Sequence, residues 1–312
     1  MNYQLAGITV GFQTDLPILD YFSNVFKAFL VEGLDPDIHY RIFQFDPEKL
    51  VLPLLTDAER LRLKQIPGFH PTRWYNSPLL RTLEVRQSVE ACLQRPDLAH
   101  VDLRLNRAVV HNFYRNELLF LYPSQNEILF GYASQNEGVH PGAVTLAPHR
   151  NKLAPMLVNF SAAMLHCSGV VCNGHAALFL ASDGGGKTTL LKDFPAQSVL
   201  NDDRVVLRRE ADRIIAHSTP FGRIYTGPQQ APLGGLFLLE KAAHFEITPI
   251  HPSEIVKHLW DEHINTWSVL PKALRPRAFE LVCDACNQAS TYRLRFSKAA
   301  VDWKAIEAAL SK

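Results

Sequence analysis

One segment constrains the fold of this chain more than any other: residues 176–191, which read AALFLASDGGGKTTLL. A run of apolar residues typical of a buried strand leads into three consecutive glycines, and Lys187-Thr188 then opens a helical pattern. A strand, a glycine-rich turn and a helix N-terminus in this order are the context of a phosphate-binding loop. The segment therefore predicts an α/β fold that holds a phosphate group.

The physical basis is direct. Glycines let backbone N–H groups approach phosphate oxygens closely, and a helix N-terminus adds unpaired donors and a positive dipole end. Lys187 would place its charge on the β- and γ-phosphates, and the Thr188 hydroxyl would ligate Mg²⁺. The predicted cofactors are ATP and Mg²⁺. The predicted nucleotide-binding residues are Ser182, Asp183, Gly184, Gly185, Gly186, Lys187, Thr188 and Thr189.

Two positions depart from the usual pattern G-x-x-x-x-G-K-[ST]. Ala181 stands where the first glycine is expected, and Asp183 brings a carboxylate into the loop. The Asp183 side chain either faces outward or orients a substrate or a metal-bound water. The alternative for the whole segment is a glycine-rich turn that only caps a helix.

A pair of carboxylates follows shortly after this loop. The apolar run 198–200 leads to Asn201-Asp202-Asp203, and a second apolar run begins at Val205. One carboxylate can hold Mg²⁺, directly or through water, and the adjacent one can accept a proton from an attacking hydroxyl. The alternative is an ordinary turn with two aspartates.

Arg223 follows Pro220-Phe221-Gly222. A glycine-flanked arginine near a nucleotide can stabilise charge on the transferring phosphoryl group. The alternative for this residue is a structural salt bridge.

Composition narrows the class of protein. The 312 residues carry 32 basic and 31 acidic side chains, so the net charge of +1 gives no case for nucleic acid or an anionic membrane as main partner. The apolar runs are shorter than the ~20 residues of a membrane helix. The N-terminus lacks the basic start of a signal peptide, and five cysteines favour reduced thiols, so we expect a cytoplasmic protein.

The chain divides near residue 145, where the composition shifts. We expect an N-terminal α+β region, rich in strands and of unknown role, over residues 1–145, and a nucleotide-binding domain over 146–312. In the first, the pattern predicts a strand over 3–12, helical structure over 18–31 and a hairpin over 117–132. In the second, it predicts a helix over 152–165 and a hairpin around Asn173-Gly174.

Three motifs together resemble a known family. They are His166-Cys-Ser-Gly-Val-Val, then the loop from Ala181 to Thr188, then Leu200-Asn-Asp-Asp-Arg-Val-Val. Their order and spacing resemble the HPr serine kinase/phosphorylase family. The segment Ala216-His-Ser-Thr-Pro-Phe-Gly222 is similar to a G-T-P-[WF] stretch in relatives of that family. The resemblance covers roughly residues 160–240.

The resemblance implies a phosphoenolpyruvate-carboxykinase-like core, with a mixed sheet flanked by helices. It also implies roles: Lys187 and Thr188 bind ATP and Mg²⁺, Asp203 is the base, Asp202 lies near the metal, and His166 sits beside the base. The roles of the two aspartates can also be reversed. The family tends to oligomerise, so a homo-oligomer is a further implication.

The leading hypothesis is an ATP- and Mg²⁺-dependent kinase that transfers the γ-phosphoryl group to a hydroxyl, such as a serine of a peptide, a protein or a small molecule. Two alternatives remain open. One is a nucleotide-binding module without phosphoryl transfer, and the other is an NTPase that acts with a partner protein.

Overall fold

A computed structural model gives the fold of the chain. It describes residues 1–14, 18–45, 109–110, 113–114, 117–122, 126–133, 149–150, 152–182, 184–223, 229–262, 270, 274–297 and 301–310. The chain divides by its contacts into two compact units. The first comprises Met1–Asn2, Val10–Asn24 and Asp35–Pro148, and the second comprises Tyr3–Thr9, Val25–Leu34 and His149–Lys312. Two short N-terminal segments therefore belong with the unit that holds the glycine-rich loop.

The N-terminal strands form a five-stranded sheet in the order β1-β2-β3-β7-β6. Their bounds are β1 (Asn2–Leu5), β2 (Ile8–Thr14), β3 (Ile38–Phe45), β6 (Glu117–Tyr122) and β7 (Glu127–Ala133). Strands β2, β3 and β7 run parallel, and β6 is antiparallel to β7, which confirms the predicted hairpin over 117–132. A separate small ladder joins β4 (Val109–Val110) to β5 (Phe113–Tyr114).

The single strand predicted over residues 3–12 is wrong, because the segment forms two strands. Ala6 and Gly7 both have positive φ, of 51° and 71°, and they turn the chain back so that β1 and β2 are two strands. Two consecutive residues of positive φ are the signature of a tight hairpin turn. The predicted helical stretch over 18–31 is present as α1 (Leu19–Val25) and a 3₁₀ turn, η1 (Lys27–Phe29).

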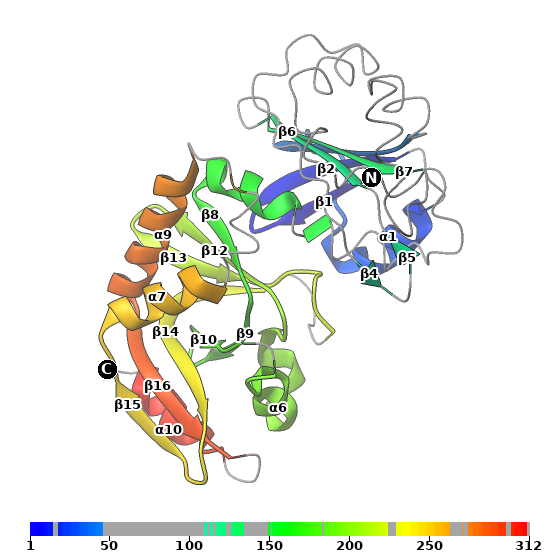
Figure 1. Ribbon diagram of the computed structural model, residues 1–312. Coiled ribbons are helices and arrows are strands. Elements are labelled where there is room, and N and C mark those ends of the chain that lie inside the picture. Colours follow the sequence, from blue (N-terminus) through cyan, green and yellow to red (C-terminus); the bar gives the residue numbers. More distant parts are fainter. Residues whose placement is uncertain are drawn as a thin grey trace, which may run out of the picture. The chain divides into compact units, whose positions relative to one another are not determined.

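The second unit is built on a mixed nine-stranded sheet (Figure 1). The order is β11-β9-β10-β14-β13-β12-β8, with β16 paired to β14 and β15 paired to β16. The strands are β8 (Ala162–Leu165), β9 (Cys167–Cys172), β10 (His175–Leu180), β11 (Val199–Asn201), β12 (Val205–Glu210), β13 (Arg213–His217), β14 (Gln230–Lys241), β15 (Glu246–Pro249) and β16 (Ser290–Phe296). Strand β14 runs parallel to β10 and β16 and antiparallel to β13, so the unit is of mixed α/β class.

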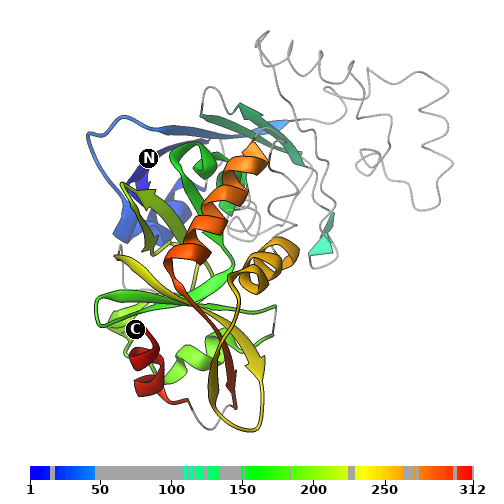
Figure 2. The same cartoon turned by 90° about the vertical axis from the view of Figure 1, so that its left-hand side faces the viewer.

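Helices cover both faces of this sheet (Figure 2). One face packs against α7 (Pro252–Glu262) and α9 (Arg275–Gln288). The other packs against α6 (Lys187–Leu190), η6 (Leu191–Asp193) and α10 (Trp303–Leu310). Strand β10 shows why: Leu178 and Leu180 point to the first face, and Ala177 and Phe179 to the second. A strand that is apolar on both faces must be covered on both faces.

Two local predictions in this unit have different outcomes. The hairpin at Asn173-Gly174 is confirmed, because β9 and β10 pair antiparallel and both turn residues have positive φ. The helix expected over 152–165 is only partly correct. Residues 152–157 are helical and a 3₁₀ turn, η5 (Val158–Phe160), follows, but 162–165 form strand β8 against β12. A short apolar run such as Ala162–Leu165 fits a buried strand as well as a helix.

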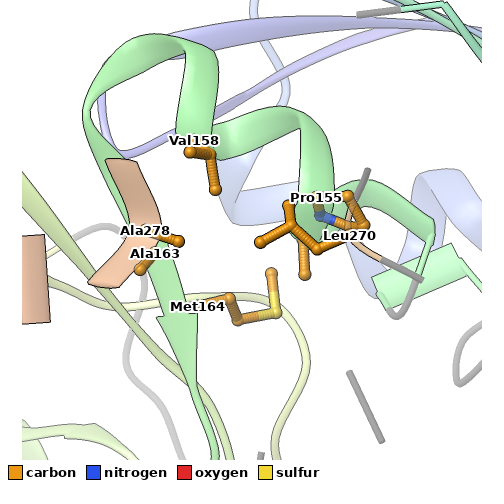
Figure 3. Close-up of a pocket in the computed structure, with 7 residues that line it drawn as sticks. Pro155, Val158, Ala163, Met164, Leu270 and Ala278 are labelled. Atoms are coloured by element: carbon orange, nitrogen blue, oxygen red, sulfur yellow. The ribbon is translucent and has the colours of Figure 1, made fainter. Parts of the chain in front are cut away.

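A small apolar cavity lies between residues 154–158, β8 and α9 (Figure 3). Its volume is about 10 Å³, and its lining side chains are all apolar. A space of this size has room for at most one water, and it offers that water no polar partner. We therefore treat it as a packing void and not as a ligand site.

Among the described residues, no helix combines the length and the apolar character that a membrane crossing requires.

The turn between β9 and β10 generates a prediction. Gly174 has φ +78°, and a Cβ at this position would meet no atom within 4 Å. Gly174→Ala should therefore lower the free energy of unfolding by about 1 kcal/mol, through backbone strain alone. Gly174→Asn is the matched control, because asparagine tolerates positive φ, and it should cost less. Urea unfolding of the two variants measures the difference, and equal losses would contradict this explanation.

Candidate active site

The direction of two neighbouring strands brings the predicted motifs together. Strands β10 and β11 both pair antiparallel with β9, so they run the same way and end at the same edge of the sheet. The glycine-rich loop follows β10, and the acidic pair follows β11. Ligands of open α/β sheets commonly bind at this carboxyl edge of the strands.

The register places His166 at the same edge. Leu180 pairs with Cys167, so Ala181 leaves the sheet beside His166. Asn201 pairs with Gly169, and pairing resumes at Val205 opposite Leu165, so residues 202–204 lie opposite 166–168. The single residue between β8 and β9 thus faces the acidic turn.

The glycine-rich loop is compact, and its glycines are needed for different reasons. Gly184 and Gly186 have φ of +75° and +100°, a region that favours glycine. A Cβ on Gly185 would lie 2.4 Å from the Ala181 Cβ. The Gly185 amide also donates to the Ser182 carbonyl over 2.9 Å, which closes a turn. Asp183 lies outside the described residues.

Lys187 begins α6 and folds back over this turn. Its side chain is buried, and its Nζ donates to the Ala181 carbonyl at 2.6 Å and to the Ser182 carbonyl at 3.3 Å. Thr188 is exposed, and Thr189 is partly buried. The loop therefore carries one positive charge against its own carbonyls, with a threonine hydroxyl at the open start of the helix.

Asp203 lies in a cluster of cationic and imidazole side chains. Its Oδ2 accepts from Arg150 Nη1 at 2.5 Å and lies 3.6 Å from Arg204 Nε, and its Oδ1 lies 3.2 Å from His166 Nε2. The structure thus brings His166 and Asp203 into contact. Sequence reasoning missed both arginines.

The pKa of Asp203 reflects this cluster. Burial alone would raise the pKa of this carboxyl. The hydrogen bond from His166 and the charges of Arg204 and Arg150 outweigh burial and lower the pKa from 3.8 to about 2. Asp203 is therefore fully ionised at neutral pH.

Asp202 has a different environment from its neighbour. It is buried, and its Oδ1 accepts a hydrogen bond from the backbone amide of Arg223 at 2.8 Å. The side chain of Arg223 is exposed. A Cβ on Gly222 would lie 2.4 Å from Asn201 Oδ1 and 2.6 Å from Asp202 Oδ1. The Pro-Phe-Gly-Arg segment thus packs its backbone directly on the acidic turn.

Asn201 and Thr219 hold the acidic turn in shape. Asn201 Oδ1 accepts from the amides of Asp203 and Arg204 at 2.7 and 2.8 Å, and its Nδ2 donates to the Thr219 carbonyl. The Thr219 hydroxyl donates to the Arg204 carbonyl at 2.8 Å. Both side chains are fully buried. The sequence did not predict these roles, because residues in a short turn show no helical or strand-like periodicity that would indicate their contacts.

Cys167 lies within electrostatic reach of both the loop and the acidic pair. Burial raises the pKa of its thiol to about 12, the charges of Lys187 and Arg204 oppose this rise, and the charge of Asp203 adds to it. Its charged neighbours are thus the loop lysine and residues of the acidic turn. Cys167 and the other cysteines that the structure describes, Cys172, Cys283 and Cys286, carry free thiols.

Within the described part of the chain, no group of three or more His, Cys, Asp or Glu side chains is placed to hold a metal. Mg²⁺ at nucleotide sites usually takes one or two protein oxygens and completes its shell with waters and phosphates. Thr188 and Asp202 are oxygen donors of the kind that such a site uses.

Comparison with known proteins identifies no family: no protein-family model matches the chain, and no curated protein matches it.

The packing of Gly222 on the acidic turn yields a second prediction. Gly222→Ala should destabilise the protein by about 1–3 kcal/mol, the range for overpacking, because the new Cβ would press on the buried side chains of Asn201 and Asp202. Its neighbour supplies the control, because Arg223→Ala keeps the backbone amide that bonds Asp202 and removes only an exposed side chain. Urea unfolding compares the two. A larger loss in Arg223→Ala than in Gly222→Ala would contradict the packing argument.

The low pKa of Asp203 yields a third prediction. Because the folded-state pKa lies below the unfolded value, the ionised form stabilises the fold above pH 4, and this contribution is lost as the pH falls from 3.8 to about 2. It is worth about 2 kcal/mol at neutral pH. Asp203→Asn should lose that stability and show a flatter pH dependence between pH 4 and pH 2. Equilibrium unfolding of the wild type and of Asp203→Asn as a function of pH measures the loss of stability and the change in pH dependence. Parallel curves for the two proteins would rule out the stabilising role of ionised Asp203.

Proposed function

We propose that this chain binds Mg²⁺·ATP and transfers the γ-phosphoryl group to a hydroxyl, such as a serine of a peptide, a protein or a small molecule. It would do so as a divergent relative of the HPr serine kinase/phosphorylase family with a phosphoenolpyruvate-carboxykinase-like core. One observation carries the proposal. The glycine-rich loop and the acidic pair follow strands that run in the same direction on either side of β9, so they meet at one edge of the sheet.

The loop supplies the features that an ATP phosphate chain requires. Its glycines permit positive φ and close backbone approach, and Lys187 holds a buried charge against the loop. A phosphate that enters would offer this amine stronger, charged acceptors than the neutral carbonyls of Ala181 and Ser182. We therefore expect Lys187 to bind the β- and γ-phosphates.

Thr188 and Asp202 would hold Mg²⁺ at the open start of α6. When bound, the ion neutralises charge on the phosphate oxygens. Asp202 is buried and already accepts the Arg223 amide, so one of its oxygens has a fixed direction. Arg223 would then act through its exposed side chain, since its backbone amide is bonded to this carboxylate.

Asp203 would orient the acceptor hydroxyl. A carboxyl with a pKa of about 2 is a weak base, but it is a charged hydrogen-bond acceptor at any physiological pH. Phosphoryl transfer has a loose transition state in most analyses, so positioning of the nucleophile matters more than early proton removal. His166, 3.2 Å away, would keep the carboxylate in place.

One observation favours a second candidate. Both oxygens of Asp203 have partners, since Oδ2 accepts from Arg150 and Oδ1 faces His166. A carboxylate engaged in this way suits a site that binds nucleotide without transferring phosphate to an acceptor. The second candidate is therefore a nucleotide-binding module, or an NTPase that acts with a partner protein.

Incubation with γ-labelled ATP and Mg²⁺ separates these functions. The probes are free serine and a library of serine-containing peptides. Label on a probe supports the kinase, free phosphate without labelled probe supports the NTPase, and saturable binding with neither supports the module. Absence of Mg²⁺·ATP binding would overturn all three.

Two substitutions separate nucleotide binding from transfer. Lys187→Ala should abolish turnover and weaken Mg²⁺·ATP binding, whereas Lys192→Ala, which removes an exposed charge five residues later, should change neither. Asp203→Asn should keep nucleotide binding and lower turnover at least ~100-fold, as expected for a group that positions the nucleophile. Calorimetry and labelled transfer measure the two effects. Full activity of Asp203→Asn would refute the role of Asp203.

A further inference from the structure

Four aromatic and imidazole rings form a buried cluster in the second unit. The cluster joins Tyr3 and Phe26, from the N-terminal segments of the second unit, to His149 and Phe221. The ring centroids of Tyr3 and Phe26 are 4.6 Å apart, and His149 lies 5.7–5.9 Å from Tyr3, Phe26 and Phe221. Tyr3, Phe26 and His149 are fully buried.

A hydrogen bond fixes two of these rings. The Tyr3 hydroxyl and His149 Nε2 are 2.6 Å apart. Burial raises the pKa of Tyr3 and lowers the pKa of His149 to about 3, so both side chains are neutral at physiological pH. The contact is therefore a neutral hydrogen bond in an apolar setting, where it is directional and costly to break.

The residues that follow two of these rings in the chain contact the two aspartates. His149 precedes Arg150, whose guanidinium binds Asp203 Oδ2. Phe221 precedes Gly222 and Arg223, whose backbone packs on and bonds to Asp202. The rings of His149 and Phe221 contact each other in the cluster, with centroids 5.8 Å apart. One buried cluster thus fixes the chain on both sides of the acidic pair.

A second contact holds the N-terminal hairpin to the same region. Arg208 Nη1 donates to the Ala6 carbonyl at 2.6 Å, and Arg208 belongs to β12, which begins two residues after Asp203. A Cβ on Gly7 would lie 2.7 Å from Arg208 Nη1. The hairpin turn is therefore packed against the strand that leaves the acidic turn.

We propose that the segment Tyr3–Thr9 positions the acidic pair, and that Tyr3 is a positioning residue that acts through His149 and Arg150 on Asp203. The inference goes beyond the proposed phosphoryl transfer, and it rests on that function only for what the aspartates do. It gives part of the N-terminal region a role within the nucleotide-binding unit. The chain beyond residue 148 would then not contain a complete site.

The test compares two tyrosines of the same unit. Tyr3→Phe removes the hydroxyl that bonds His149. Tyr292→Phe removes a buried hydroxyl that donates to the Ala309 carbonyl at 2.8 Å, on the face of the sheet covered by α10. Each variant loses one buried hydrogen bond, so their general effects on stability should be similar. Only the hydrogen bond of Tyr3 leads to the acidic pair, through His149 and the adjacent Arg150, which binds Asp203.

The readout that does not depend on activity is the side-chain ¹H–¹⁵N spectrum of the histidines in full-length protein, with His166 assigned from its loss in His166→Gln. We expect Tyr3→Phe to shift the ring-nitrogen signals of His166 in the direction produced by Asp203→Asn, and Tyr292→Phe to leave them unchanged. Unchanged His166 signals in folded Tyr3→Phe would overturn the proposal. Equal shifts in both variants would also overturn it, because they would show a general effect of lost stability.

Turnover of Mg²⁺·ATP gives a second readout. Tyr3→Phe should lower kcat about tenfold while the Kd for Mg²⁺·ATP stays within about twofold, since the Tyr3 hydrogen bond holds the segment that binds Asp203, and misplacement of this residue acts on the chemical step. A wild-type protein without turnover would refute the proposed function, and the His166 signals would still decide the present proposal. Where Tyr3→Phe does not fold, Phe26→Leu replaces it, because it keeps an apolar side chain and removes the ring contact.

Discussion

The close approach of four strands at Gly169 is the constraint on which the site depends. A Cβ at this position would lie 2.7 Å from Leu178 Cδ2 on β10 and 3.2 Å from Val205 Cγ2 at the start of β12. Gly169 also pairs with Asn201 on β11. A residue with a Cβ at this position would push Leu178 and Val205 aside, so the packing at Gly169 opposes a slip of β9 against its neighbours. A slip by one residue would also turn every side chain of the strand to the other face. The register that places the glycine-rich loop beside the acidic turn is therefore pinned by packing at a single position.

The electrostatics of the site are set by the charged side chains that lie at the glycine-rich loop and at the acidic turn. Lys187 lies against the loop, and Arg150 and Arg204 lie near Oδ2 of Asp203, so cationic side chains lie at both turns. Cations that the fold holds in fixed positions favour an anion such as a phosphate chain. The hydrogen bond from His166 and the charges of Arg204 and Arg150 lower the pKa of Asp203 and keep it ionised, which makes it an acceptor of hydrogen bonds rather than a strong base.

The parts of the site that sequence reasoning found are those encoded locally. Asn173-Gly174 marks a hairpin by its own backbone preferences, and the glycines before Lys187 mark their turn in the same way. The contact of His166 with Asp203 was implied only by a resemblance of motifs. Arg150 and Tyr3 gave no signal, because their contacts with Asp203 and His149 join residues 53 and 146 positions apart. Residues 162–165 were misread for a related reason: only pairing with β12 decides that they form a strand.

The acidic pair lies outside the hydrogen-bonded ladders of the sheet. Its position therefore depends on contacts from distant segments of the chain. The pairing of β11 with β9 stops at Asn201, and the pairing of β12 with β8 begins at Val205, so residues 202–204 have no partner in these ladders. Buried backbone groups outside a ladder need other hydrogen-bond partners, and the side chains of Asn201 and Thr219 supply them here. They fix the backbone of the turn but not the direction of the Asp203 carboxylate, which depends on Arg150 and His166. Arg150 directly follows His149, whose ring is held by Tyr3, so the outermost strand of the N-terminal hairpin bears on the orientation of a carboxylate two hundred positions later in the chain.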